Sequence, residues 1–200
     1  MFFVLNAYFA AGMFILINPF IAIFFGEQYC FSTVTVALII TSFFITGLRR
    51  VNLIFREGMG LFWNDRYKAV AESIINLVVS LLLVKPFGIA GIVGGTIIST
   101  VTTCAWIEPY VLMKHGIKED WQARLRRYFA EYAQYCALTA ALSAAGGYAA
   151  SRFPIDHIGK FLAAGVLYTI VFAAVILLRY RKTEEYSSLK ARCFALVRRK

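Results

Sequence analysis

Long apolar runs alternate along the chain with short polar segments, and each run has about the 20 residues that a helix needs to cross a bilayer. The pattern predicts an all-α integral membrane protein with six transmembrane helices, which form one domain over residues 1–180. A basic tail over residues 181–200 follows this domain. We place the six spans at residues 2–25, 33–62, 68–86, 89–113, 129–151 and 158–179.

The second predicted span carries three arginines, Arg49, Arg50 and Arg56, at a depth where a charge is costly. At 100° per residue the arginines share one face with small and polar residues, while Phe44 and Leu48 lie on the opposite face. The polar positions form a stripe that stays on the same side of the helix both before and after the arginines. We therefore expect a single continuous helix with one side toward a wet cavity. The other members of the stripe are Ser42, Thr46, Glu57 and Gly60, with Leu53 as an apolar interruption.

The third predicted span has a polar row of its own, Glu72, Asn76 and Ser80, at four-residue spacing. Only a short turn separates it from the second span, so the two helices should be antiparallel neighbours. We therefore predict an ion pair between Arg56 and Glu72, which would lower the cost of both charges in the membrane. Such a pair either locks two helices or belongs to a cavity, and we favour the cavity because Arg49 and Arg50 have no evident acidic partner.

The fourth predicted span carries small residues at four-residue spacing, Gly91, Gly95, Ser99 and Thr103. Small residues in this register let helix backbones approach closely, so we interpret them as a packing face. Glu108-Pro109 near the end of the span is interpreted as an interfacial kink, with a gate or hinge as the alternative.

Composition supports the membrane assignment: 60% of residues are hydrophobic, only 16% are charged, and the mean hydropathy is +0.68. The net charge of +10 does not indicate nucleic-acid binding, because most Lys and Arg residues lie between the apolar runs or in the tail. Fifteen of them fall on one side of the predicted topology and three on the other. This bias predicts a cell-membrane location with both termini in the cytoplasm. Residues 118–129 and the tail also predict amphipathic helices on the inner leaflet, in contact with membrane lipids.

Candidate chemistry is sparse. The histidines are single loop residues, and no nucleophile, paired-carboxylate, phosphate-loop or metal-ligand pattern is visible in the sequence. We therefore expect no enzymatic activity and no cofactor.

Three segments nevertheless resemble a known family. Residues 60–68 (GLFWNDRYK), 75–78 (INLV) and 85–91 (KPFGIAG) are similar to the C-terminal half of bacterial Wzx-type polysaccharide flippases, members of the multidrug/oligosaccharidyl-lipid/polysaccharide exporter superfamily. The resemblance covers roughly residues 1–180 and is most distinctive over 56–110.

This resemblance implies one lobe of a MATE-like flippase fold, which moves an undecaprenyl-pyrophosphate-linked oligosaccharide across the cytoplasmic membrane. It implies that Arg49, Arg50 and Arg56 face the anionic substrate, with Glu72 and Asn76 beside them. Full members contain two such lobes, so we expect a truncated or half-length member that pairs with a second six-helix lobe on another polypeptide. Two alternatives stay open: a non-catalytic scaffold of a polysaccharide assembly complex, and a drug or small-cation exporter.

Overall fold

The computed structural model describes residues 2–153 and 155–180, and every regular element in this part of the chain is a helix. The predicted amphipathic tail lies outside the described residues. The α-helices are α1 (Phe2–Phe24), α2 (Thr33–Gly58), α3 (Lys68–Phe87), α4 (Ile89–Thr102), α5 (Cys104–Val111), α6 (Trp121–Arg152) and α7 (Ile158–Tyr180). Two 3₁₀ helices, η1 (Glu27–Tyr29) and η2 (Leu61–Asp65), and a π-helix, η3 (Leu112–Ile117), connect them.

The apolar helices are consistent with a membrane protein and confirm the all-α fold class. Five helical stretches of the described chain are long and apolar enough to span a bilayer: Phe2–Phe24, Thr33–Gly58, Leu61–Phe87, Ile89–Ile117 and Ile158–Arg179. The fifth predicted span, 129–151, lies inside α6, which does not belong to this set. A six-span lobe therefore stays a prediction.

Two predicted boundaries were wrong. The second span ends at Gly58, because Gly60 adopts a left-handed backbone with φ +68° and a 3₁₀ helix follows. Residues 118–129 do not form a separate helix, since α6 begins at Trp121 and continues without interruption to Arg152. The fourth predicted span, 89–113, lies within the stretch Ile89–Ile117, which a distortion at Thr103 divides into α4 and α5.

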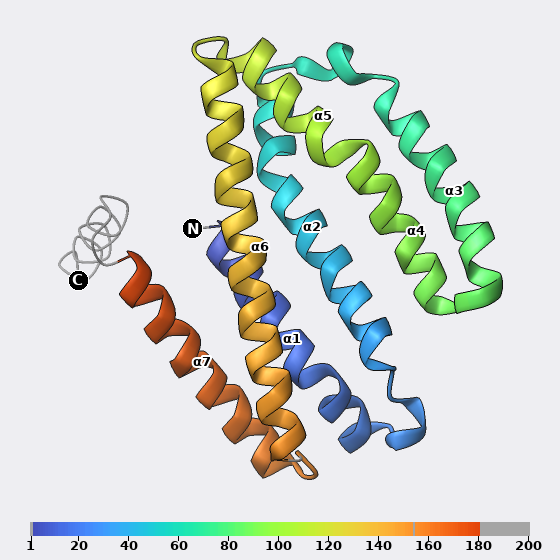
Figure 1. Ribbon diagram of the computed structural model, residues 1–200, viewed down its shortest axis with the longest axis vertical. Helices are drawn as coiled ribbons and strands as arrows, with labels where there is room; N and C mark the ends of the chain where they lie inside the picture. Colours follow the sequence, from blue (N-terminus) through green and yellow to red (C-terminus); the bar gives the residue numbers. More distant parts are fainter. Residues whose placement is uncertain (1, 154, 181–200) are drawn as a thin grey trace.

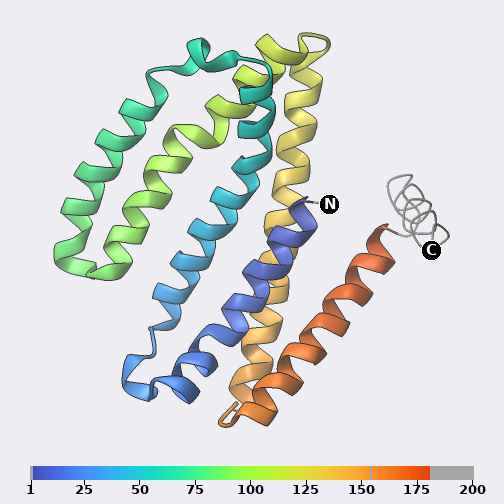
Figure 2. The ribbon, with the colours of Figure 1, turned by 180° about the vertical axis from the view of Figure 1, so that it is seen from behind.

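The helices form an elongated bundle with a central group and two flanks (Figure 1). Helices α1, α2 and α6 lie side by side, the α3–α4 hairpin leans away on one flank, and α7 stands on the other, as the view from behind also shows (Figure 2). Helix α5, η2, η3 and the start of α6 gather at one end of the bundle.

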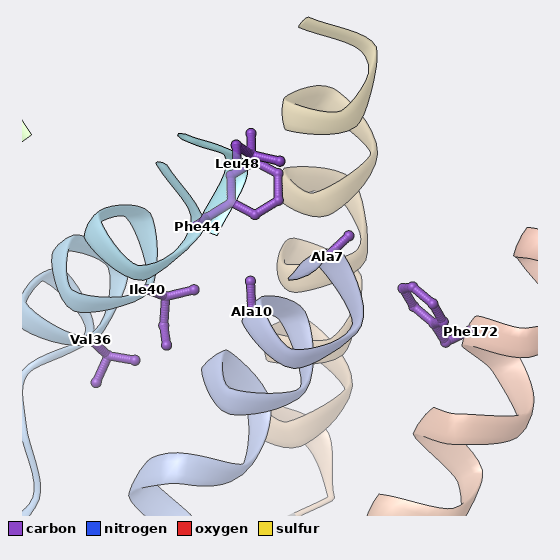
Figure 3. Close-up of a cluster of buried hydrophobic side chains, with 7 residues drawn as sticks. All are labelled: Ala7, Ala10, Val36, Ile40, Phe44, Leu48 and Phe172. Atoms are coloured by element: carbon purple, nitrogen blue, oxygen red, sulfur yellow. The ribbon is translucent and has the colours of Figure 1, made fainter. Parts of the chain in front are cut away.

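The hydrophobic core lies where α1 crosses α2. Buried residues recur along α2 at four-residue spacing, which places them on one side of the helix, and small alanines of α1 let the two backbones approach. Figure 3 shows these side chains together with one ring from α7. The cluster consists of Ala7, Ala10, Val36, Ile40, Phe44, Leu48 and Phe172.

Two helix pairs pack closely because one partner lacks a side chain at the contact. The predicted packing face of α4 is confirmed: Gly91 lies against the backbone of Leu83, Gly95 lies against Ser80, and both glycines are buried. At the α1–α2 crossing the side chain of Asn6 occupies the space beside Gly47 and donates to the carbonyl oxygen of Phe44 at 2.8 Å.

Candidate functional site

Arg49 lies at the centre of a group of buried and partly buried charged side chains. Its Nε and Nη2 donate to the two carboxylate oxygens of Glu108 at 3.1 and 2.7 Å, and its Nη1 donates to Glu72 Oε1 at 3.1 Å. The Glu108 side chain is fully buried. A bidentate guanidinium–carboxylate pair is among the strong hydrogen-bonded arrangements, so Arg49 holds α2 to both α3 and α5.

Lys68, the first residue of α3, extends this group toward η2. Its Nζ lies 2.7 Å from Glu108 Oε1 and 3.2 Å from Asp65 Oδ2. Asp65 also accepts a hydrogen bond from Arg56, whose Nε is buried without a hydrogen-bond partner among the described residues. Glu108 therefore receives two cations, and Asp65 receives two.

We call these six residues the ion cluster. It contains three cations and three carboxylates, so its formal charge is zero when all are ionised. Balance matters here, because a charge left unpaired after removal of its buried partner typically costs about 3–5 kcal/mol. The members are Arg49, Arg56, Asp65, Lys68, Glu72 and Glu108.

Neutral groups complete the coordination of Glu72. Its Oε2 accepts from the thiol of Cys104 at 2.9 Å, and its Oε1 accepts from Thr100 Oγ1 at 3.3 Å. Asn76, one turn further along α3, donates to Thr96 Oγ1 at 3.1 Å and to Ser99 Oγ at 3.2 Å. The polar row of α3 thus faces α4 and α5, and its hydrogen bonds join α3 to both of these helices.

The predicted pair between Arg56 and Glu72 is wrong. Arg56 pairs with Asp65 in the connecting segment, while Glu72 pairs with Arg49. The prediction counted residues from the turn between α2 and α3, but the 3₁₀ helix η2 places its own carboxylate within reach of Arg56. The expectation that Arg49 lacks an acidic partner is also wrong, since it has two.

Arg50 differs from its neighbours. It is exposed, and within residues 2–153 and 155–180 it makes no hydrogen bond or ion pair. It lies on the exposed face of α2 with Thr46 one turn before it and Glu57 two turns after it. The predicted polar stripe is thereby divided: Arg49 and Arg56 turn into the protein, and Arg50 turns outward.

Sequence reasoning did not place Asp65, Lys68 and Glu108 in the site. Asp65 and Lys68 were placed only in the short turn between the second and third predicted spans, and their side chains are 3% and 7% exposed. Glu108 was assigned to an interfacial kink. The sequence did contain a signal for Glu108, because it is a carboxylate inside a long apolar run. Such a residue in a membrane span needs a cationic partner.

Within the described part of the chain, no three His, Cys, Asp or Glu side chains gather in a way that could hold a metal ion. Comparisons with protein-family models, with curated proteins and with solved structures each return no significant match. The arrangement of charges is therefore the basis for a functional assignment. Each cluster cation is already matched by a carboxylate, whereas Arg50 is open to an anion.

Proposed function

We propose that the chain is one lobe of a membrane transporter that flips an undecaprenyl-pyrophosphate-linked oligosaccharide, with Arg50 as the contact for the diphosphate or an acidic sugar. One observation carries the proposal: Arg50 is an exposed guanidinium on an apolar helix, and no described residue neutralises it. The resemblance of residues 60–68 and 85–91 to flippases agrees with this cargo.

The position of Arg50 supports an anionic ligand over a purely structural role. It lies eight residues before the end of α2 at Gly58, which corresponds to about 12 Å along the helix axis. An ionisable residue at such a position in a membrane helix is a functional candidate by default. Contact with a phosphate there is stronger than in bulk water, because the surrounding dielectric constant is lower.

In this proposal the ion cluster forms the frame of the transporter and does not contact cargo. It joins α2, η2, α3 and α5 at one end of the bundle and presents no unmatched charge. Arg49, Arg56, Glu72 and Asn76 then act on transport through the position of α2. When the transporter changes the membrane face to which its cavity opens, the ion cluster would move as one unit.

Binding of a fluorescent undecaprenyl-diphosphate oligosaccharide to the chain in nanodiscs tests the proposal. Arg50→Ala should weaken binding about tenfold, because one charge-assisted contact is lost. Arg50→Lys should keep most of the affinity. Lys85→Ala is the matched control, since Lys85 is an exposed cation on another helix, and it should bind as the wild type does. Equal affinity of the wild type and Arg50→Ala would contradict the proposed contact.

One observation favours a second candidate, the non-catalytic scaffold of an assembly complex. The complete pairing of Arg49, Arg56 and Lys68 is what a rigid docking platform requires. A scaffold would place Arg50 against a partner helix. Photo-crosslinking from position 50 in cells separates the two functions: a crosslink to lipid-linked sugar supports the flippase lobe, and a crosslink to protein alone supports the scaffold.

A further inference from the structure

A cavity of about 610 Å³ opens beside the first three turns of α6, and no member of the ion cluster lines it. Met113 and Ile117 of η3 form its apolar wall, and Arg124 and Arg127 of α6 form a basic wall. The cavity does not include Arg50, so it is independent of the transport proposal.

This end of the molecule has the features of a membrane–water interface. Helix α6 has 32 residues and is about 48 Å long, well beyond the roughly 30 Å of a hydrocarbon core. Cations cover aromatic rings close by: the Arg66 guanidinium lies 4.2 Å from the Trp63 ring centre, and Lys114 Nζ lies 4.9 Å from that of Tyr110. Amphipathic rings with adjacent cations are typical of the headgroup layer.

The cavity contains charges of both signs. Arg127 Nε donates to Glu131 Oε1 at 2.9 Å, so the terminal nitrogens of its guanidinium are free for another acceptor. Arg124 makes no side-chain hydrogen bond or ion pair within the described part of the chain. Asp120 also lines the cavity, one helical turn before Arg124. Two cations and two carboxylates give the lining a formal charge of zero. Glu131 is paired with Arg127, whereas the Asp120 side chain makes no hydrogen bond or ion pair with the described residues.

The rest of the lining is held in place. The hydroxyl group of Tyr128 accepts a hydrogen bond from Asn52 Nδ2 at 2.8 Å, which fixes its ring at the cavity and ties α6 to α2. Asp120 adopts a left-handed backbone with φ +44°, as does Lys118 with φ +67°. These two residues form the tight connection that sets the Asp120 side chain beside the first turn of α6.

We propose that this cavity binds the headgroup of a zwitterionic phospholipid, with the phosphate against Arg124 and Arg127 and the ammonium group against Asp120. Guanidinium groups are suited to phosphate, and an ammonium group is attracted both to carboxylates and to the face of a tyrosine ring. The apolar wall formed by Met113 and Ile117 suits the glycerol backbone and the first methylene groups. An anionic headgroup would leave the Asp120 carboxylate unmatched.

Native mass spectrometry of the delipidated full chain with added phosphatidylethanolamine tests this site. The double variant Arg124→Ala/Arg127→Ala should bind this lipid about tenfold more weakly, because both phosphate contacts are lost. Arg126→Ala is the matched control, because Arg126 is exposed on the same helix but does not line the cavity. It should bind as the wild type does. An equal loss in this control, or no loss in the double variant, would overturn the site.

Headgroup selectivity gives a second, independent measurement. The wild type should prefer phosphatidylethanolamine to phosphatidylglycerol, and Asp120→Asn should abolish the preference. Asn tolerates the left-handed backbone at position 120, so this variant keeps the local fold. Soluble O-phosphoethanolamine should displace the lipid, whereas inorganic phosphate at the same concentration should not. Equal displacement by inorganic phosphate would identify a free-phosphate site, and absence of preference in the wild type would refute zwitterion recognition.

Discussion

The two flanks of the bundle, defined as the segment from α2 to α5 on one side and α7 on the other, are held by different forces. The α2–α5 flank is joined by the ion cluster and by polar bonds such as those of Asn76. On the other flank α7 contacts α1 through rings and hydroxyl groups: Tyr168 donates to the carbonyl oxygen of Tyr8 at 2.6 Å, and the ring centres of Tyr8 and Phe172 lie 5.2 Å apart. Cavities of about 430 Å³ and 640 Å³ lie beside α7, one toward α6 and one toward α1.

The difference follows from the bilayer as solvent. Apolar side chains gain little by leaving lipid for protein, so helix association there depends on close packing and on polar pairing. The α2–α5 flank has both, because small residues bring α3 and α4 together and charges fix α2 and α5 against them. Helix α7 has an apolar sequence with few polar anchors and cavities beside it. We therefore expect the first flank to determine stability and the second to move more readily.

The largest effect should come from the centre of the ion cluster. Glu108→Gln removes the carboxylate shared by Arg49 and Lys68, which leaves both cations underpaired, and should destabilise the protein by about 3–5 kcal/mol. Unfolding of the purified protein in mixed micelles by increasing sodium dodecyl sulfate, followed by circular dichroism, measures this. Glu119→Gln, at an exposed position on the same end, should leave the midpoint unchanged. A similar shift in both variants would show that the cluster does not dominate.

The next effect should come from the α1–α2 crossing. Gly47→Ala places a methyl group where Asn6 lies and should cost about 1–3 kcal/mol through forced displacement. Gly58→Ala is the control, because an added methyl group there meets nothing within 4 Å. The double variant Asn6→Ala/Gly47→Ala should be less destabilised than the sum of the single variants, since the clash is removed. If the destabilising effects of the two single substitutions were strictly additive, the contact between Asn6 and Gly47 would be contradicted.

On the α7 flank the effect should be smaller. Tyr168→Phe removes the hydrogen bond to Tyr8 and keeps the ring contacts, so we expect a loss of about 0.6 kcal/mol, typical of such bonds in membrane proteins. Amide hydrogen exchange of α7 should rise in this variant while that of α3 and α4 stays unchanged. Tyr29→Phe, at an exposed position, serves as the control. Faster exchange throughout the bundle would mean that the two flanks are not independent.

The smallest effect concerns the loop before α7. Hydrogen bonds from Lys160 and His157 lower the pKa of the exposed Asp156 carboxyl to about 2, below its ordinary value of 3.8. Its contribution to stability is therefore present above about pH 4 and is lost as the pH falls toward 2. Because the group is fully exposed, solvent screens this contribution, and Asp156→Asn should not change the denaturation midpoint at pH 7. A measurable shift there would contradict this.

The sequence predicted the features that depend on local pattern. Periodicity placed Phe44 and Leu48 together on the apolar face of α2, where both are in the core, and four-residue spacing identified Gly91 and Gly95 as a packing face. It did not predict which charges pair. The partner of Arg49 lies 59 residues away on α5, and the packing of α5 against α2 and the start of α3 places Glu108 between Arg49 and Lys68. This placement depends on how the helices pack in three dimensions. The periodicity of residues along a single helix does not determine that packing.

The ion cluster also sets an order for biogenesis. During synthesis, helix α2 emerges from the ribosome with Arg49 and Arg56 before any of the cluster carboxylates exists. Asp65 follows nine residues after Arg56, and Glu72 follows 23 residues after Arg49, but Glu108 appears last. Lateral release of α2 into lipid before then would cost about 2.5–3.5 kcal/mol for Arg49, which lies away from both ends of the helix, whereas Arg56 lies in its last turn. The translocation machinery is therefore expected to retain α2 until α5 arrives, so that the segment from α2 to α5 enters the bilayer together.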